Sequence, residues 1–201
     1  MNNWIQLASG GGYDFDTAEL FGPFSVEDDL AWPLTCPRYT KHTRRGVVWT
    51  VALHSVACAR AIISMTGQLT AGAAGLLHDM HEAVIGDITT PVARHVDYAR
   101  VKALKSQVDA AICEKLGIPT KCRPGCSHHT GYVDLADQAA LQIERTLFCA
   151  PEPRQWTVPR AGIAWERALY KEIIRLQDNY GDMSDGGFAA FMEEYHRLVK
   201  E

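Results

Sequence analysis

The chain has 201 residues, of which 47% are hydrophobic and 22% are charged. These values exclude disordered and fibrous proteins, and the length predicts a single domain over residues 1–201 whose core needs no disulfide bonds. The net charge of −4 and the isoelectric point near 6.1 argue against a binding surface for duplex nucleic acid, because such a surface is basic.

The sequence contains no segment that predicts export or membrane insertion. Its first residues, MNNWIQLASGGG, lack the basic and apolar regions of a secretory signal, and no run of 18 apolar residues occurs. We therefore expect a cytoplasmic protein whose six cysteines are free thiols. Cys122 and Cys126 stand in CRPGCSHH, but their spacing departs from the common zinc patterns, so we expect a plain loop, with a zinc site as the alternative.

Residues 1–46 are expected to form an irregular leader. The stretches SGGGYDFD and FGPF are rich in turn residues. Ser25, followed by Asp28, predicts a capped short helix, which Pro33 and Pro37 then end. No strand is expected anywhere in the chain, because no stretch of four or more residues alternates convincingly between polar and apolar side chains.

Helical periodicity begins near residue 47 and continues along most of the chain. Val47, Val51, His54, Cys58 and Ile62 follow one another at intervals of three or four residues and therefore share one helix face. Further helices are expected at about 70–84, 98–116, 132–148, 163–176 and 188–199. We predict an all-α bundle of about six or seven helices, with the C-terminal helices over residues 160–200.

Three of these helices carry metal-binding residue types on their apolar sides: His54, then His78 with Asp79, then Asp137. Burying an ionised carboxylate alone costs on the order of several kcal/mol, and a divalent cation that binds imidazole and carboxylate together is the simplest compensation. Taken singly, His54 fits a hydrogen-bonded core histidine and Asp137 a surface or capping carboxylate. Taken jointly, the four residues predict a metal site within residues 47–148.

The order of these residues, H…HD…D, resembles that of the HD-domain metal-dependent phosphohydrolases. The segments LHSVACA, LLHDMHEAVIGDITTPV and LADQAALQIE are similar to three landmark segments of that superfamily. The middle segment resembles the 5′-deoxynucleotidase and phage deoxynucleotide (dATP) hydrolase branch in particular. The resemblance implies an HD-domain helical bundle and one divalent metal ion, Co²⁺, Mn²⁺, Zn²⁺, Fe²⁺ or Mg²⁺, held by His54, His78, Asp79 and Asp137.

The resemblance also implies catalytic roles for two carboxylates. Glu82, three residues after Asp79, is implied to orient or deprotonate the attacking water or to pass a proton to the leaving oxygen. Asp87 is implied to contact the sugar or to assist catalysis. The alternatives are a surface carboxylate for Glu82 and a turn or capping residue for Asp87. His81 is expected to support a ligand or to lie at the surface, because no further carboxylate pair for a second metal is evident.

Substrate contacts are expected from the leader and from the region after the HD segment. By resemblance, Arg38 binds phosphate, Tyr39 packs on the sugar or base, and His42 touches phosphate or caps the following helix. Ordinary packing is the alternative for Tyr39. A lysine that the branch commonly carries is missing here, so we expect Arg94 or Lys102 to supply positive charge.

The function that we expect is hydrolysis of the 5′-phosphate of deoxynucleoside monophosphates. One alternative is a phage-type triphosphohydrolase acting on dATP or other dNTPs, and a second is a non-catalytic HD module that binds nucleotides. The expected partner is a deoxynucleotide, with no duplex nucleic acid and no membrane, and the compartment is the host cytoplasm if the protein is phage-encoded. Phe188 and Phe191 of the last helix allow for a homo-oligomer, although core packing explains them equally well.

Overall fold

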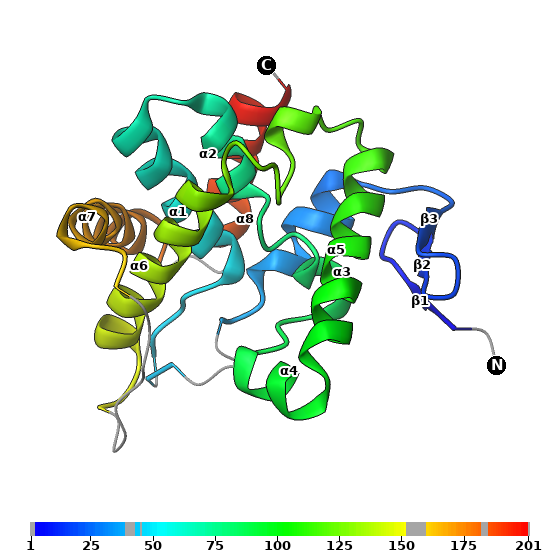
Figure 1. The fold of residues 1–201 in the computed structure, drawn as a ribbon, viewed down its shortest axis with the longest axis horizontal. Helices are drawn as coiled ribbons and strands as arrows, with labels where there is room; N and C mark the ends of the chain where they lie inside the picture. The colour runs from blue at the N-terminus through cyan, green and yellow to red at the C-terminus, as the bar shows by residue number, and fades with distance from the viewer. Residues whose placement is uncertain (1–2, 39–42, 45, 152–159, 182–184, 201) are drawn as a thin grey trace.

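The computed structural model describes residues 3–38, 43–44, 46–151, 160–181 and 185–200. Two of the predicted substrate residues, Tyr39 and His42, lie outside this range. The described chain is mostly helical, with a small sheet at its N-terminal end (Figure 1), which confirms the predicted helical bundle. None of the described helices is both long and apolar enough to cross a membrane.

The leader forms a three-stranded antiparallel sheet in the order β1 (Trp4–Gln6), β2 (Gly12–Asp14) and β3 (Glu19–Phe21). The side chain of Tyr13 in β2 is buried in the core. The expectation that the chain has no strand is therefore wrong for this segment. Each strand has three residues, too few to show the alternation of polar and apolar side chains that identifies a strand in a sequence.

A short helical turn, η1 (Val26–Ala31), follows the sheet. The Ser25 hydroxyl accepts a hydrogen bond from the backbone N–H of Asp28 at 3.0 Å, which confirms the predicted cap. The buried Asp29 carboxylate accepts hydrogen bonds from the backbone N–H groups of Ser9 and Ser25, at 2.9 and 2.7 Å. The bond from Ser9 joins the loop between β1 and β2 to η1, and the bond from Ser25 stabilises the start of η1.

Eight α-helices build the bundle within the described residues. They are α1 (Val51–Thr66), α2 (Leu69–Leu76), α3 (Glu82–Ile85), α4 (Thr90–Val96), α5 (Tyr98–Lys115), α6 (Thr130–Phe148), α7 (Ile163–Tyr180) and α8 (Gly186–Tyr195). Short turns are η2 (Pro33–Thr35), η4 (Thr120–Cys122) and η5 (His196–Lys200). The helices predicted at 98–116 and 132–148 are confirmed as α5 and α6. The number exceeds six or seven because α4 was not expected and the helix predicted at 70–84 is divided in two.

Helix α1 lies at the centre of the bundle and packs against α2, α6, α7 and α8 (Figure 1). The Thr50 hydroxyl accepts a hydrogen bond from the backbone N–H of Leu53 at 3.2 Å, so the helix begins at Val51 rather than near residue 47. His54 lies in the first turn of α1 and is fully buried. A largely buried helix therefore carries one of the predicted metal ligands.

The predicted continuous helix over residues 70–84 is wrong, because α2 ends at Leu76 and α3 begins at Glu82. His78 and Asp79 lie in the turn between the two helices. The Nδ1–H of His78 donates to the carbonyl oxygen of Gly75 at 2.7 Å. In a continuous helix that carbonyl would accept the backbone N–H of Asp79. Here the ring of His78 donates to that carbonyl in place of the Asp79 N–H, and the chain turns. The Asp79 side chain therefore does not point in the direction that a continuous helix would give it.

Helix α8 supplies side chains to the core rather than to the surface. Phe191 is fully buried, and Phe188 is half-buried with its ring edge-on to Trp32, at a centroid distance of 5.9 Å. Both aromatic residues therefore pack in the core, which was one of the two roles that the sequence allowed. Phe191 presents no exposed surface to a partner.

Candidate metal centre

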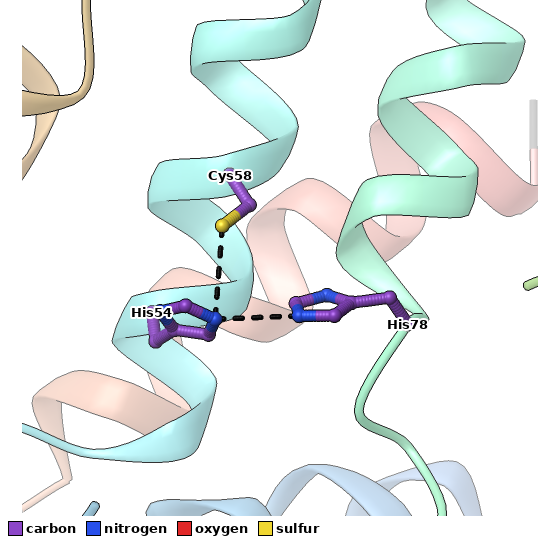
Figure 2. A group of neighbouring side chains, drawn as sticks. All are labelled: His54, Cys58 and His78. Atoms are coloured by element: carbon purple, nitrogen blue, oxygen red, sulfur yellow. Dashed lines mark hydrogen bonds between the residues drawn. The ribbon is translucent and has the colours of Figure 1, made fainter. Parts of the chain in front are cut away.

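Two histidine rings face each other at the centre of the site. The Nε2 atoms of His54 in α1 and His78 in the α2–α3 turn lie 3.3 Å apart (Figure 2). Nδ1 of His78 donates to the Gly75 carbonyl, and Nδ1 of His54 lies 2.6 Å from the Glu144 carboxylate. Both Nδ1 atoms therefore carry their protons in hydrogen bonds, and both Nε2 lone pairs point into the same space. Two lone pairs at this distance need a proton or a cation between them.

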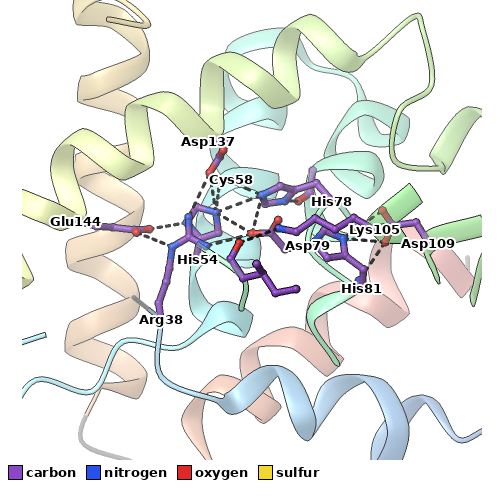
Figure 3. Close-up of polar contacts among 12 residues, drawn as sticks. Arg38, His54, Cys58, His78, Asp79, His81, Lys105, Asp109, Asp137 and Glu144 are labelled. Carbon is purple, nitrogen blue, oxygen red and sulfur yellow. Dashed lines mark hydrogen bonds and ion pairs between the residues drawn. The ribbon is translucent and has the colours of Figure 1, made fainter. Parts of the chain in front are cut away.

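Two carboxylates complete what we call the four-ligand cluster, formed by His54, His78, Asp79 and Asp137 (Figure 3). Oδ2 of Asp79 lies 3.2 Å from Nε2 of His78 and 3.8 Å from Nε2 of His54. Oδ1 of Asp137 lies 3.2 Å from Nε2 of His54 and 3.9 Å from Nε2 of His78. The fold thus brings together all four predicted ligands, from α1, the α2–α3 turn and α6.

The four-ligand cluster fits one divalent ion. Neighbouring donor atoms that bind an ion at about 2.1 Å lie about 3.0 to 3.4 Å apart. The nitrogen–oxygen separations of the cluster, 3.2 to 3.9 Å, are close to that range. Two imidazoles with two carboxylates suit Mn²⁺, Fe²⁺, Co²⁺ or Zn²⁺. The Asp137 side chain is 45% exposed, against at most 16% for the other three, so the cluster opens to solvent at Asp137.

Glu144 is a supporting residue that the sequence prediction missed. Its buried carboxylate lies 2.6 Å from Nδ1 of His54 through one oxygen and accepts a hydrogen bond from Nε of Arg38, at 3.0 Å, through the other. A carboxylate on the far nitrogen of a ligating histidine fixes the orientation and tautomer of the ring. Glu144 follows Asp137 by seven residues, which places both on one face of α6. The seven-residue spacing from Asp137 is the sequence feature from which Glu144 could have been identified.

Arg38 binds the carboxylates around the four-ligand cluster. Its guanidinium donates to Asp79 at 3.1 Å, to Asp137 at 3.3 Å and to Glu144 at 3.0 Å (Figure 3). The residue is only 9% exposed, so these charges interact in a medium of low dielectric constant. The predicted phosphate ligand thus lies at the edge of the cluster, and its binding to phosphate stays a prediction.

The members of the four-ligand cluster shift one another's pKa values. Burial lowers the pKa of His78, but the Asp79 carboxylate outweighs burial and raises that pKa to about 10. Burial raises the pKa of Asp79, but the positive charges of His78 and Arg38 hold it well below its usual range. His78 and Asp79 therefore form an ion pair in the metal-free protein. A metal ion that binds there must displace the proton on the imidazole.

A thiol lies beside the two imidazoles. Cys58 follows His54 by one turn of α1, and its Sγ lies 3.7 Å from Nε2 of His54 (Figure 2). The ligand atoms of His54, Cys58 and His78 all lie within 4.8 Å of one another, so a soft ligand is within reach of the same space. Five of the cysteines are free thiols, as predicted: Cys36, Cys58, Cys113, Cys122 and Cys126. No comparable group of described residues includes Cys122 or Cys126.

Glu82 lies in α3 with its carboxyl group buried next to the four-ligand cluster. It is 5% exposed, and its Oε2 has no hydrogen-bond partner within the described part of the chain. Burial, reinforced by the negative charges of Asp79 and Asp87, raises the pKa of Glu82 to about 8. Such a group can hold or release a proton near neutral pH. The alternative of a surface carboxylate is therefore wrong for Glu82, and Asp87 lies close enough to act on it.

Positive charge near Glu82 comes from Arg38 and, to a smaller extent, from Lys105, which was not predicted. Arg94 and Lys102 have exposed side chains on α4 and α5. Lys105, further along α5, lies close enough to oppose the rise in the pKa of Glu82, and its Nζ donates to the carbonyl oxygen of Ile88 at 3.4 Å. The position of Lys105 follows from how α5 crosses the segment after α3, which the sequence pattern does not indicate.

Comparison with known proteins agrees with this geometry. A family model described as HD domain matches residues 38–123, less than half of the chain. The match includes His54, His78 and Asp79, whereas Asp137 lies beyond it. It supports the HD-domain superfamily for this segment, and HD domains imply metal-dependent phosphohydrolase activity in general. No curated protein matches the chain significantly.

Proposed function

We propose that this protein is a metal-dependent phosphohydrolase that removes the 5′-phosphate from deoxynucleoside monophosphates. The convergence of the four-ligand cluster on one space, with the Arg38 guanidinium at its edge, is the observation that carries the proposal. A divalent ion held there would lower the pKa of a water molecule and offset the negative charge of a phosphoryl group. The deoxynucleotide class rests on the resemblance of LLHDMHEAVIGDITTPV to the 5′-deoxynucleotidase branch.

Glu82 is the group of this chain that we assign to proton transfer. Its buried carboxyl group, with a pKa near 8, can take a proton from the attacking water or give one to the O5′ atom as the phosphorus–oxygen bond breaks. Asp87, whose charge reaches Glu82, is assigned to the sugar by resemblance. Arg38 is assigned to the phosphate, because a guanidinium fork suits phosphate oxygens.

The charges near the four-ligand cluster support a monophosphate over a triphosphate. Arg38 is held by three carboxylates, and Lys105 stands near Glu82. These two cations, counted among the described residues alone, suit a single phosphate group. A triphosphate carries more negative charge and would call for more positive charge at the site.

Orthophosphate release from a panel of deoxynucleoside and ribonucleoside monophosphates, with Mn²⁺ or Co²⁺, tests the proposal. We expect turnover of the deoxynucleotides, and we expect Asp79→Ala to lose both turnover and bound metal. His95→Ala is the matched control, because His95 is exposed on α4 and should leave both unchanged. Release of tripolyphosphate from dNTPs, without turnover of monophosphates, would favour the triphosphohydrolase alternative. Nucleotide binding with no turnover under any divalent ion would favour the non-catalytic module.

A further inference from the structure

The thiol of Cys58 faces the space between the two imidazoles of the four-ligand cluster. Cys58 follows His54 by four residues on α1, so both side chains lie on one side of the helix. Its Sγ lies 3.7 Å from Nε2 of His54, the nitrogen that the contact of Nδ1 with Glu144 leaves available (Figure 2). Two ligands four residues apart on one helix are a spacing that proteins use to bind zinc. The position of Cys58 therefore indicates a metal ligand.

The separations among the sulfur and the two imidazole nitrogens fit one ion. A nitrogen about 2.1 Å and a thiolate sulfur about 2.3 Å from the same ion lie about 3.6 Å apart at a tetrahedral angle. The distance from Sγ of Cys58 to Nε2 of His54 is 3.7 Å, and the Nε2 atoms of His54 and His78 lie 3.3 Å apart. All three ligand atoms lie within 4.8 Å of one another. One ion can therefore contact the sulfur and both nitrogens with little movement of the side chains.

Cys58 lies on the buried side of the four-ligand cluster. Cys58 and His54 have no exposed surface, whereas the Asp137 side chain is 45% exposed and lies where the cluster opens to solvent. A sulfur ligand at Cys58 therefore leaves the open side to water and to substrate. With Cys58 the protein supplies five ligands, which leaves one position free on a six-coordinate ion. The hydrolysis proposed above is thus compatible with a sulfur ligand.

His81, the second histidine of LLHDMHEAVIGDITTPV, binds a different partner. It is buried, its backbone N–H donates to Oδ1 of Asp109 at 3.0 Å, and its Nδ1 lies 3.1 and 3.2 Å from the two oxygens of that carboxylate (Figure 3). The predicted alternative of a surface position for His81 is therefore wrong. The group of ligand atoms that contains both His54 and His78 includes Cys58 and not His81. Within that group of described residues, Cys58 is the side chain that extends the ligand set.

We propose that Cys58 binds the divalent ion of the four-ligand cluster through its sulfur, and that this thiolate makes the centre selective for Zn²⁺ over Mg²⁺ and Mn²⁺. The sulfur–metal bond forms as the thiol proton passes to solvent. Thiolate is a soft ligand that favours zinc, whereas carboxylate and water ligands suit magnesium and manganese. The inference rests on the proposed function, because the ion is the one to which phosphate hydrolysis is assigned.

Spectroscopy of the metal-loaded full chain tests the sulfur ligand without any assay of activity. Bound Co²⁺ should show the near-ultraviolet charge-transfer absorption of a thiolate ligand, and X-ray absorption of the Zn²⁺-loaded protein should show one sulfur at about 2.3 Å from the ion. Cys58→Ser and Cys58→Ala should lose both signals while one ion stays bound to the four-ligand cluster. Cys113→Ser is the matched control and should keep both signals, because Cys113 is similarly buried, in α5, and belongs to no such group of described residues.

The metal preference gives a second measurement. In competition titrations, Cys58→Ala should lower the affinity for Zn²⁺ relative to Mn²⁺ by roughly 10- to 100-fold or more, because losing a residue that only orients a ligand already costs that much. Unchanged relative affinities would overturn the selectivity.

The wild-type spectrum decides the sulfur ligand even if neither variant folds, which circular dichroism would show. A wild-type Zn²⁺ centre with only nitrogen and oxygen ligands would overturn the sulfur ligand and leave the proposed function standing. A sulfur signal that persists in a folded Cys58 variant would do the same. Wild-type protein that binds no divalent ion would overturn both proposals.

Discussion

Glu144 decides how His54 presents its nitrogen to the four-ligand cluster. The pair is fully buried, and the 2.6 Å contact with Nδ1 leaves only Nε2 for a ligand. The same carboxylate accepts a hydrogen bond from Arg38, so one side chain orients a histidine and holds a guanidinium in place. Neutral His54 with Nε2 free is the form that a metal ion requires.

Replacing Glu144 by glutamine should weaken metal binding while the protein stays folded. The amide keeps the size of the side chain but loses the negative charge that orients His54 and pairs with Arg38. We expect a loss of metal affinity of roughly 10- to 100-fold, measured by calorimetric titration with Mn²⁺ or Co²⁺. Glu114→Gln, at an exposed position of α5, is the matched control and should bind metal as the wild type does. Equal affinities in both variants would contradict a supporting role for Glu144.

Helices α1 and α2 approach each other closely because two glycines face α1. A Cβ atom on Gly72 would lie 2.5 Å from the side chain of Ile63, and one on Gly75 would lie 2.5 Å from Cδ1 of Ile62. Gly75 also offers the carbonyl that orients His78. The close approach therefore sets the distance between α1, which carries His54, and α2, which leads directly into the turn that carries His78.

A methyl group at Gly75 should loosen this contact. We expect Gly75→Ala to lower the free energy of unfolding by about 1–3 kcal/mol, the usual cost of overpacking a core, and to weaken metal binding through the Gly75 carbonyl. Urea denaturation of the metal-free protein measures the first effect. Gly131→Ala in α6 is the control, because a Cβ there meets no atom within 4 Å and alanine favours helices. A Gly75 variant as stable as the Gly131 variant would argue against the close approach.

The charge network of the whole site should make the stability of the metal-free protein depend on pH. The pKa of His78 rises from its ordinary 6.5 to about 10 on folding, so its ion pair stabilises the fold fully below pH 6.5. That contribution is lost as the pH rises through about 10. In excess chelator we therefore expect the melting temperature to fall between pH 6.5 and 10.

Saturating Mn²⁺ should remove this fall in the melting temperature, because the metal ion has already displaced the proton from His78. His78→Gln, whose amide does not titrate, should show a smaller fall than the wild type in chelator. Differential scanning calorimetry across the pH range makes both comparisons. An identical pH dependence in the loaded protein, the metal-free protein and the variant would show that the imidazole is not responsible.

The sequence by itself determined the helical class and the ligand types. The periodicity of residues 98–116 and 132–148 is a local property, since the side chains on one face of a helix recur every three or four residues, and both helices form. The four metal ligands could be predicted because each is a polar, metal-binding residue among apolar neighbours in the sequence: His54, His78, Asp79 and Asp137.

Only the tertiary structure decided how those residues are oriented and supported. The break of the predicted helix at His78 depends on a ring-to-carbonyl hydrogen bond, and the contact of Arg38 with Glu144 joins residues 106 positions apart. His81 and Asp109 meet only because α5 packs beside the α2–α3 turn. The positions of helices and the types of the ligands can be predicted from residues that are close in the sequence. Hydrogen bonds and ion pairs between distant residues depend instead on how the helices pack.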